Sequence, residues 1–325
     1  MIITRTPFRI SFAGGGTDLP SFYRGFGGGA VTSAAIDRFI HVLVNEKFDP
    51  SIRVAYSKTE NVDSVDDLQH GLVREALRLT QVHRAVEVHT IADIPGEGTG
   101  IGSSSSLTVG LLNALYAYKG QLVEPARLAE EAARIEINIL HGTLGKQDHY
   151  IAAFGGLHYF DFRPDDTVRV HPIPLSRTDM DALSSHLSLF YTGTARSGQP
   201  ILKEQDARTT QNQDALFRMR DLAGEMRDAF MARDWDRAGA LLDEGWQLKR
   251  GLTPGISNEQ IDEWYARGQA AGALGGKITG AGGGGFLLLF HPPERSAQVA
   301  SALSPLERMA VRISPEGSRI LTVQR

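Results

Sequence analysis

The sequence predicts an α+β protein built from two domains, and three observations lead to this prediction. The chain has 325 residues, close to the length at which a single hydrophobic core stops growing and the chain divides. Strand patterns and helix patterns are mixed, without the regular alternation that a doubly wound parallel sheet requires. The character of these patterns also changes near residue 165. We therefore expect an N-terminal domain over residues 1–165 and a C-terminal domain over residues 166–325.

The expected elements of the first domain follow from their local patterns. Runs rich in β-branched and aromatic residues predict strands at 2–13, 39–47, 53–57, 85–90 and 157–162. Apolar residues at helical spacing predict helices at 66–79 and 125–140, and the second begins at a proline, which suits the first position of a helix. Residues 103–118 are apolar almost all round, so they predict a buried helix.

The same criteria predict fewer elements in the second domain. Strands are expected at 187–192 and 286–290. Amphipathic helices are expected at 216–230 and 235–248. No internal repeat is visible, and the two domains are expected to share an interface.

The composition is that of an ordinary globular protein and excludes several functions. The net charge of −4 gives none of the positive excess that a nucleic-acid-binding protein carries. Cysteine is absent, which excludes a disulfide framework, a thiolate nucleophile and a zinc ribbon. No apolar run approaches the roughly 20 residues of a membrane-spanning helix. We expect a cytoplasmic protein with no nucleic-acid or membrane partner; a homodimer or a higher homo-oligomer remains open.

Glycine is the most informative residue, because its 35 copies are clustered. The strongest cluster lies at 95–106, reads PGEGTGIGSSSS, and leads directly into the apolar helix. Alternating glycines let successive N–H groups converge, and the helix N-terminus adds unpaired donors, so the segment suits a polyphosphate. The serines offer an N-cap and a hydroxyl group for Mg²⁺. The segment lacks the lysine of a Walker A loop, and a serine-capped helix after a flexible turn is the alternative.

A second glycine cluster lies at 277–285, reads KITGAGGGG, and runs straight into an expected strand. A turn needs only one or two glycines. Four in succession favour a backbone that approaches a ligand closely.

A third segment, residues 4–18, combines an expected strand with three glycines. It brings Thr17 and Asp18 beside a tight backbone turn. An aspartate after a turn commonly forms an Asx turn or a helix cap, which is the alternative to a role in binding.

A fourth segment, residues 134–150, carries two carboxylates. Glu136 lies near the end of an expected helix, and two glycines then bend the chain to present Lys146, Gln147 and Asp148 on a loop. Two carboxylates in such an arrangement can divide proton acceptance and Mg²⁺ coordination between them. A solvated charge cluster is the alternative.

In this order, the four segments resemble the GHMP kinase superfamily, which includes galactokinase and the homoserine, mevalonate and phosphomevalonate kinases. PFRISFAGGGTD is similar to the first motif of that superfamily, PGEGTGIGSSSS to the second, and KITGAGGGGF to the third. The resemblance covers nearly the whole chain. It implies the two-domain GHMP kinase fold, with an N-terminal domain like ribosomal protein S5 and a ferredoxin-like C-terminal domain. It also implies transfer of the γ-phosphoryl group of ATP to an alcohol group, with Mg²⁺.

Within that superfamily the sequence most resembles the D-glycero-D-manno-heptose 7-phosphate kinases. The shared stretches are RTPFRISFAGGGTDLPSFY, GKQDHYIAAFGG and YTGTARS. Mevalonate kinases instead tend to have Gly-Glu-His in the first motif and Ser-Gly-x-Asp at the catalytic loop. The resemblance therefore implies phosphorylation of the anomeric hydroxyl of a heptose 7-phosphate, giving the 1,7-bisphosphate used in nucleotide-activated heptose synthesis for surface polysaccharide.

The resemblance also assigns roles to single residues. Asp148 matches the catalytic aspartate that accepts or orients the hydroxyl proton, and Arg9 falls where the family has a basic partner that keeps this carboxylate ionised. Ser104 and Glu136 match the ligands of Mg²⁺, although the spacing of Glu136 to Asp148 differs by one residue from mevalonate kinases. Asp18 matches the aspartate that binds sugar hydroxyls in galactokinases.

The complete set of implied contacts is larger. The residues expected to bind the nucleotide are Gly98, Gly100, Gly102, Ser103, Ser104, Ser105, Gly280, Gly282 and Gly283. The residues expected to bind the substrate are Thr17, Asp18, Lys146, Gln147 and Arg196. A sugar phosphate also needs a cationic cradle, for which Arg196, Lys203 and Lys146 are candidates by charge, with a solvated surface as the alternative for each.

Three other functions remain open. The protein could be a kinase for another sugar, such as L-fucose or a uronic acid. It could be a diphosphate decarboxylase of the same superfamily, although the sugar-type GGGTD motif speaks against this. A non-catalytic ligand sensor would tolerate loss of Asp148, Glu136 or Ser104, yet acidic and hydroxyl groups stand at all three positions.

Overall fold

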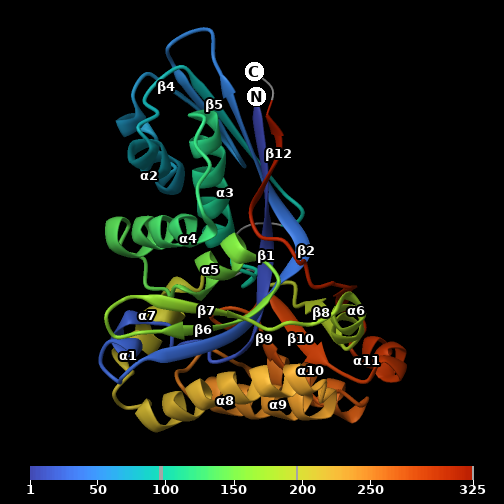
Figure 1. Cartoon of the computed structure of the whole chain (residues 1–325). Helices are drawn as coiled ribbons and strands as arrows, with labels where there is room; N and C mark the ends of the chain where they lie inside the picture. Colours follow the sequence, from blue (N-terminus) through green and yellow to red (C-terminus); the bar gives the residue numbers. More distant parts are fainter. Residues whose placement is uncertain (95–97, 195–196, 324–325) are drawn as a thin grey trace.

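The computed structural model describes residues 1–94, 98–194 and 197–323, which form two β-sheets surrounded by helices (Figure 1). The strands of the larger sheet are β1 (Ile2–Ala13), β2 (Gly29–Glu46), β3 (Ile52–Ala55), β4 (Thr59–Val62), β5 (Val86–Ala92), β6 (Leu157–Phe162), β7 (Val168–Pro172) and β12 (Arg319–Val323). Their order is β12-β1-β2-β5-β3-β4, and β6 and β7 extend the sheet from β2. The β3–β5 pair is parallel and its neighbours are antiparallel.

Strand β2 is the longest element of the sheet and joins its two parts. Residues 40–46 pair with β5, whereas residues 29–34 pair with β6. The sequence predicted only the second half of this strand, at 39–47. Residues 29–36 are buried on both faces and small or apolar throughout, so they lack the alternation that marks a half-exposed strand.

Four helices cover one face of the larger sheet (Figure 1). They are α2 (Gly71–Thr80), α3 (Ser103–Tyr118), α4 (Pro125–Ala133) and α5 (Gln147–Phe154). Helix α3 packs directly on β1 and β2, and the Thr4 hydroxyl donates to the Gly110 carbonyl over 3.0 Å. The central position of α3 explains why its sequence is apolar almost all round.

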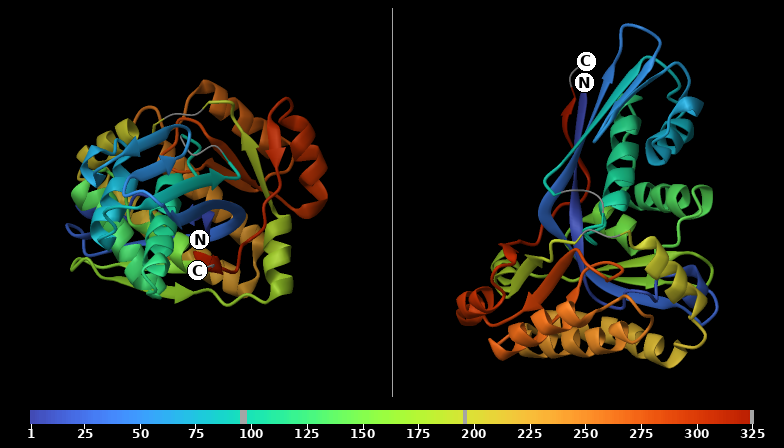
Figure 2. Two further views of the ribbon diagram at one scale, coloured as in Figure 1. Left: turned by 90° about the horizontal axis from the view of Figure 1, so that it is seen from above. Right: turned by 180° about the vertical axis from the view of Figure 1, so that it is seen from behind.

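The second sheet has the order β11-β8-β10-β9 and lies beside the lower end of the first (Figure 2). Its strands are β8 (Leu187–Tyr191), β9 (Gly275–Ile278), β10 (Phe286–Phe290) and β11 (Glu307–Met309). The helices of this part are α6 (Arg177–Ser185), α7 (Gln199–Ala207), α8 (Gln213–Ala232), α9 (Trp235–Arg250), α10 (Glu259–Ala270) and α11 (Ser296–Ala302). Helix α8 packs on β1, β2 and β6 of the larger sheet, whereas α9 packs on both β9 and β1 and therefore connects the two sheets.

The chain ends next to its start, because β12 returns to the larger sheet and pairs with β1. Strands β6 and β7 likewise pair with each other across residue 165. The expected division at that residue stays a prediction. Among the described residues, no helix is long and apolar enough to cross a membrane.

Several element predictions are confirmed residue for residue, including the strand at 2–13 and the helix at 103–118. The helix expected at 66–79 is instead a 3-10 turn (Val65–Asp67) followed by α2. The helix expected at 125–140 changes after α4 into a π-helix (Arg134–Ile139). The prediction that a loop presents Gln147 and Asp148 is wrong in part, because both residues belong to the first turn of α5.

Two helical glycines test how closely α3 packs on the sheet. A Cβ at Gly110 would lie 2.8 Å from Thr6 Oγ1 and 3.3 Å from Val42 Cγ2, whereas a Cβ at Gly224 in α8 would meet nothing within 4 Å. We predict that Gly110→Ala lowers the free energy of unfolding by about 1–3 kcal/mol through overpacking. Gly224→Ala should raise it by up to about 1 kcal/mol. Urea denaturation measures both, and equal effects would contradict the close packing.

Candidate active site

The two glycine-rich segments lie against each other. The Thr279 hydroxyl donates to the Thr99 carbonyl over 3.2 Å, and a Cβ at Gly280 would lie 2.6 Å from the Gly100 Cα. Gly98, Gly100, Gly102, Gly280, Gly282 and Gly283 all have positive φ angles, which glycine adopts most readily. Loops that are far apart in the sequence therefore meet, backbone against backbone. Residues 95–97, the start of the first segment, lie outside the described residues.

Part of the second glycine run is explained by packing within the protein. The Gly283 N–H donates to the Ile256 carbonyl over 2.9 Å, and a Cβ at Gly282 would lie 2.7 Å from the same oxygen. A Cβ at Gly285 would lie 2.4 Å from the Thr99 carbonyl oxygen. The glycine run favoured close approach to a ligand over a simple turn, but close backbone packing within the protein also requires these glycines.

Helix α3 begins at the junction of these loops with its N-terminus open. Gly102 is the N-cap and supplies no side chain, and the Ser106 N–H makes the first helical bond back to Gly102. Ser106 Oγ donates to the Pro7 carbonyl, which fixes the helix on β1. The first amides of the helix, in Ser103 to Ser105, are therefore available to an anion.

The serines themselves differ in environment. The side chain of Ser104 is exposed, and Ser103 Oγ lies 3.5 Å from Thr99 Oγ1. Ser105 Oγ is buried and has no hydrogen-bond partner among the described residues. Ser104 therefore has the exposure that a metal ligand needs, whereas the Ser105 side chain faces the interior.

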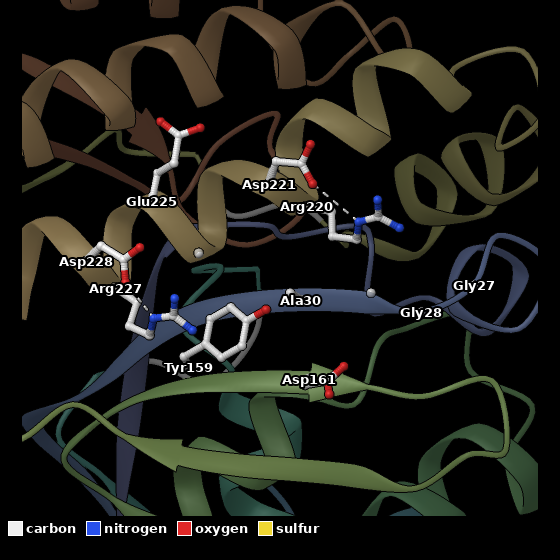
Figure 3. A pocket seen from close by; sticks show the side chains of 12 residues that line it. Gly27, Gly28, Ala30, Tyr159, Asp161, Arg220, Asp221, Glu225, Arg227 and Asp228 are labelled. Carbon is white, nitrogen blue, oxygen red and sulfur yellow. Dashed lines mark hydrogen bonds and ion pairs between the residues drawn. The ribbon is translucent and has the colours of Figure 1, made fainter.

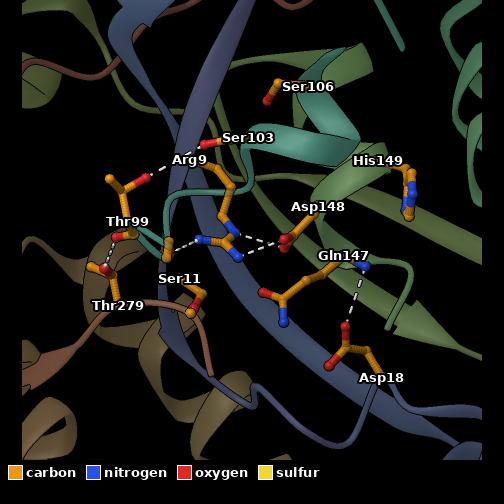
Figure 4. A network of polar contacts seen from close by, with 12 residues as sticks. Arg9, Ser11, Asp18, Thr99, Ser103, Ser106, Gln147, Asp148, His149 and Thr279 are labelled. Atoms are coloured by element: carbon orange, nitrogen blue, oxygen red, sulfur yellow. Dashed lines mark hydrogen bonds and ion pairs between the residues drawn. The ribbon is translucent and has the colours of Figure 1, made fainter. Parts of the chain in front are cut away.

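Arg9, which is buried, and Asp148, which is partly buried, form an ion pair at the same junction (Figure 4). Arg9 Nε donates to Oδ1 of Asp148 over 2.6 Å, and Nη2 donates to Oδ2 over 2.5 Å. Arg9 Nη1 donates to the Gly100 carbonyl over 2.6 Å. One guanidinium group thus holds both the predicted catalytic carboxylate and the predicted phosphate loop.

The local backbone of β1 directs Arg9 to this position. The register of β1 with β2 shifts between Pro7 and Arg9, and again between Ser11 and Ala13. Such bulges turn side chains and are frequent next to active sites. Arg9 and Ser11 consequently face the glycine loops from the middle of a long strand.

Asp18 holds the start of α5, on which Asp148 stands. Its Oδ2 accepts from the Gln147 N–H over 3.3 Å, and its Oδ1 accepts from the Gly16 N–H over 3.0 Å. A Cβ at Gly145 would lie only 1.8 Å from Asp18 Oδ2, so this glycine is required for the contact. Burial raises the pKa of Asp18 and the charge of Asp148 adds to this, whereas the two N–H groups oppose it.

Glu136 lies in a buried cluster behind Asp148. Its Oε1 accepts from Thr108 Oγ1 at 3.1 Å and lies 3.0 Å from His149 Nε2. Thr108 also donates to the carbonyl of Ser104, so one residue connects the two predicted Mg²⁺ ligands. Glu136 is part of the π-helix, whose wider turn adds a residue and is frequent at functional sites.

Two further residues predicted to bind the substrate, Thr17 and Lys146, make their polar contacts with other groups of the protein. Thr17 is fully buried and its hydroxyl donates to the carbonyls of Gly14 and Ala30. Lys146 Nζ donates to the Asp166 carbonyl and lies over the Tyr23 ring. These contacts do not support a role of Thr17 or Lys146 in substrate binding.

The other two candidates for a cationic cradle differ from each other. Lys203 is exposed on α7. Arg196 lies outside the described residues. The roles of both stay predictions.

A narrow cavity opens between these groups. It is lined by Arg9, Ser11, Gly15, Gly16, Asp18, Leu19, Leu144, Gly145, Gln147, Asp148, Leu202, Gln205, Lys249, Gly280 and Ala281. Both halves of the chain contribute, since α7 supplies Leu202 and Gln205, and α9 supplies Lys249. This cavity is the candidate acceptor site, because it ends at Asp148 beside the glycine loops.

The sequence analysis did not identify three buried polar residues of this region, Gln205, Lys249 and Lys277. Lys277 Nζ donates to Ser11 Oγ over 3.2 Å. Burial lowers the pKa of Lys249 to about 8 and lowers that of Lys277 strongly. Lys249 follows Trp246 by three residues on the buried side of α9, so helical spacing signals its burial.

A larger surface groove of about 490 Å³ lies away from this site, between β2, β6 and α8 (Figure 3). Its arginines are paired with their sequence neighbours, Arg220 with Asp221 and Arg227 with Asp228. The residues that line it include none of the predicted site residues. The candidate site is therefore the smaller cavity at Asp148.

An open helix N-terminus, two joined glycine loops and a carboxylate facing them define the protein as a phosphotransferase of small molecules. Comparison with family models matches residues 70–156 to the GHMP kinases N-terminal domain and residues 226–305 to the GHMP kinases C-terminal domain. The chain belongs to the GHMP kinase superfamily and is an ATP-dependent kinase that phosphorylates an alcohol group.

The chain is similar to characterised relatives over most of its length. It is 27% identical to the D-glycero-α-D-manno-heptose 7-phosphate kinase of Campylobacter jejuni, over 93% of both chains. It is 29% identical to the mevalonate kinase of Methanothermobacter thermautotrophicus, over 84% of this chain and 86% of the relative. The structure of a D-glycero-D-manno-heptose 1-phosphate kinase from Bacteroides thetaiotaomicron superposes over 100% of both chains with a TM-score of 0.83 and 24% identity. The predicted two-domain α+β fold is confirmed.

The catalytic role of Asp148 can be tested with a control substitution at an aspartate that occupies the same position in another helix. Asp148 and Asp214 each occupy the second position of a helix, but Asp214 is exposed on α8. We predict that Asp148→Asn lowers kcat roughly 10²-fold or more, because the hydroxyl is no longer oriented, while ATP still binds. Asp214→Asn should leave kcat unchanged. Steady-state kinetics and ATP titration measure this, and an active Asp148→Asn enzyme would contradict the assignment.

Proposed function

We propose that the protein is a Mg²⁺-dependent kinase that phosphorylates the anomeric hydroxyl of D-glycero-D-manno-heptose 7-phosphate and produces the 1,7-bisphosphate. The observation that carries this proposal is the Arg9–Asp148 pair, which faces the acceptor cavity and contacts the phosphate loop through the Gly100 carbonyl. Similarity to a heptose 7-phosphate kinase over 93% of both chains supports the choice of sugar.

The chemistry follows from the positions of these groups. The acceptor oxygen forms a bond to the γ-phosphorus of ATP, the bond from that phosphorus to the bridging oxygen breaks, and ADP leaves. The hydroxyl proton passes to Asp148. Both oxygens of Asp148 already accept hydrogen bonds from Arg9, so the carboxylate is held in one orientation. It can therefore orient the acceptor hydroxyl for in-line attack on the γ-phosphorus.

Ser104 and Glu136 fit the ligand set of a magnesium ion. Mg²⁺ binds through one or two protein oxygens and substrate phosphates and keeps several waters. Ser104 is exposed beside the open end of α3, and Thr108 and His149 both contact Oε1 of the Glu136 carboxylate. When bound, Mg²⁺ neutralises charge on the β- and γ-phosphates.

The lining of the acceptor cavity favours a polyhydroxylated substrate. Asp18, Gln147 and Gln205 present carboxylate and amide groups to it, and each suits sugar hydroxyls. Leu19, Leu144, Leu202 and Ala281 also line the cavity, so the three polar groups, and not an absence of apolar surface, favour a sugar. The chain is thus proposed as a sugar kinase rather than a mevalonate kinase, despite similarity to both.

We further propose that the enzyme acts in the cytoplasm, where ATP is supplied, on a small sugar phosphate. Its product would be the activated precursor from which nucleotide-linked heptose is made for surface polysaccharide. Another GHMP sugar kinase, of the L-fucose or uronate type, is the second candidate.

The substrate is tested by a panel assay coupled to ADP release. The panel contains D-glycero-D-manno-heptose 7-phosphate, the free heptose, L-fucose, D-glucuronate and mevalonate. We expect the highest kcat/KM with the heptose 7-phosphate, and a new anomeric phosphate signal in the phosphorus NMR spectrum. A higher kcat/KM with any other acceptor, or the absence of an anomeric phosphate, would overturn the proposed substrate.

Glu136→Gln tests the proposed metal site. The amide keeps an oxygen for Thr108 but removes the charge, so we predict that about 10- to 100-fold more Mg²⁺ is needed for half-maximal activity. Activity is measured as Mg²⁺ is varied at saturating ATP. Glu130→Gln, on the exposed side of α4, is the control. An unchanged Mg²⁺ requirement in Glu136→Gln would remove this residue from the site.

A further inference from the structure

Lys249 is a buried cation of the acceptor cavity whose charge has no direct partner. It lies on α9, is 5% exposed, and its Nζ donates to the Gly280 carbonyl. In the part of the chain that the structure describes, no carboxylate lies within ion-pair distance of Nζ. A buried ammonium is unfavourable unless it is paired, so its retention needs a reason beyond stability.

The anions closest to Lys249 are already engaged by other groups. Asp148 accepts two bonds from Arg9, and Asp18 accepts from two backbone N–H groups. A second buried lysine, Lys277, lies behind Ser11, and burial lowers its pKa strongly. Arg9 and Lys249 line the cavity together with the carboxylates Asp18 and Asp148. Since Arg9 is paired with Asp148, an anion bound in the cavity would supply the direct partner that Lys249 lacks.

The position of Lys249 indicates which anion this is. Its partner Gly280 packs on Gly100, whose carbonyl accepts from Arg9 Nη1. Lys249 and Arg9 therefore lie on either side of the junction between the two glycine loops. In the proposed reaction, the terminal phosphate of ATP would bind at this junction, at the open end of α3 and beside the acceptor cavity.

Two unpartnered amide atoms independently show that the cavity is built for a polar ligand. Gln147 Oε1 and Gln205 Nε2 are buried without a hydrogen-bond partner among the described residues, and both residues line the cavity. Their exposed fractions are 8% and 2%. Buried polar atoms are normally satisfied, so such a pair indicates contacts that a ligand completes.

We infer that Lys249 binds the phosphoryl group during its transfer, and that Gln147 and Gln205 bind hydroxyl groups of the acceptor. Lys249 is then a catalytic residue that stabilises negative charge on the equatorial oxygens of the phosphoryl group. It comes from the C-terminal half of the chain, opposite Arg9 and Asp148 of the N-terminal half. The inference rests on the proposed phosphoryl transfer but not on the identity of the sugar.

The test replaces Lys249 by Met, which has a similar shape and no charge. We expect kcat to fall about 10²-fold with little change in KM for the acceptor, because the contact forms in the transition state. The acceptor is whichever member of the panel the wild-type enzyme uses best. Lys58→Met, at an exposed turn between β3 and β4, is the control and should leave kcat unchanged.

The second readout is the slow rate of ATP hydrolysis in the absence of an acceptor sugar. In that reaction, water receives the same γ-phosphoryl group. Lys249→Met should lower this rate also, whichever sugar is the natural acceptor. A higher KM for a phosphorylated acceptor, with kcat and the hydrolysis rate unchanged, would overturn the inference, because Lys249 would then bind the phosphate of the acceptor. If the panel assay identifies an acceptor other than the heptose 7-phosphate, that acceptor is used in this test, and the inference about Lys249 is unaffected.

Thermal unfolding separates a catalytic role from a structural one. Removing an unpaired buried charge should leave the Tm of Lys249→Met unchanged or higher. Should this variant unfold, Lys249→Arg, which retains the cation, is expected to keep part of kcat. A folded but fully inactive Lys249→Arg enzyme would then refute the role of the charge.

The pH profile gives a further readout. Burial and the nearby Arg9 lower the pKa of Lys249 to about 8, whereas the charges of Asp18 and Asp148 oppose this, and Lys277 lies close by. The ammonium is present below this pH and is lost above it, so kcat/KM should fall as the pH rises through about 8. The Lys249→Arg enzyme should lack this decrease, and an identical profile in both enzymes would contradict the inference.

Discussion

The candidate site depends on one guanidinium group. Arg9 places two of its N–H groups on Asp148 and a third on the Gly100 carbonyl, so it fixes the carboxylate and the phosphate loop relative to each other. A planar group with fixed donor directions can do this, whereas an ammonium would act as a point charge. The bulge in β1 that directs Arg9 inward, the start of α5 and the open end of α3 all meet at this group.

Close backbone contact is the second constraint, and it explains the glycines. A Cβ at Gly100, Gly280 or Gly285 would lie within 2.6 Å of a backbone atom of the other loop. The two loops can therefore form one surface only if side chains are missing on both. At Gly145 the contact is instead with the Asp18 carboxylate, which caps α5. The same residue type thus builds the phosphate side and the acceptor side of the site.

The sequence predicted those parts of the fold that have strong local patterns. The apolar helix at 103–118 and the strand at 2–13 are correct to the residue, since each has a continuous pattern and clear ends. The start of α5 was missed for two reasons. Glycines precede this helix, and the residue that caps it, Asp18, lies more than a hundred residues away in the sequence. The first half of β2 was missed because it is buried on both faces and shows no alternation.

The same distinction applies to the site residues. Arg9, Asp18 and Asp148 lie in glycine-rich motifs, and the motifs led to all three. Gln205 and Lys249 lie in helices with an ordinary amphipathic sequence. The spacing of Lys249 from Trp246 indicates that its side chain is buried, but only the packing of α7 and α9 against the glycine loops places both side chains in the cavity. Their role depends on contacts between distant parts of the chain, which no local pattern contains.

The two carboxylates of the cavity show how environment divides similar groups between different tasks. Asp148 faces a cation, and both of its oxygens are fixed by Arg9 at the end of the cavity beside the phosphate loop. Asp18 accepts from the backbone N–H groups of Gly16 and Gln147, and burial raises its pKa. A carboxylate that is already unfavourable as an anion gains from a hydrogen-bond donor, and a sugar hydroxyl supplies one without adding charge. Binding of a hydroxylated acceptor at Asp18 would therefore relieve the cost of its burial and bring the reacting oxygen toward Asp148.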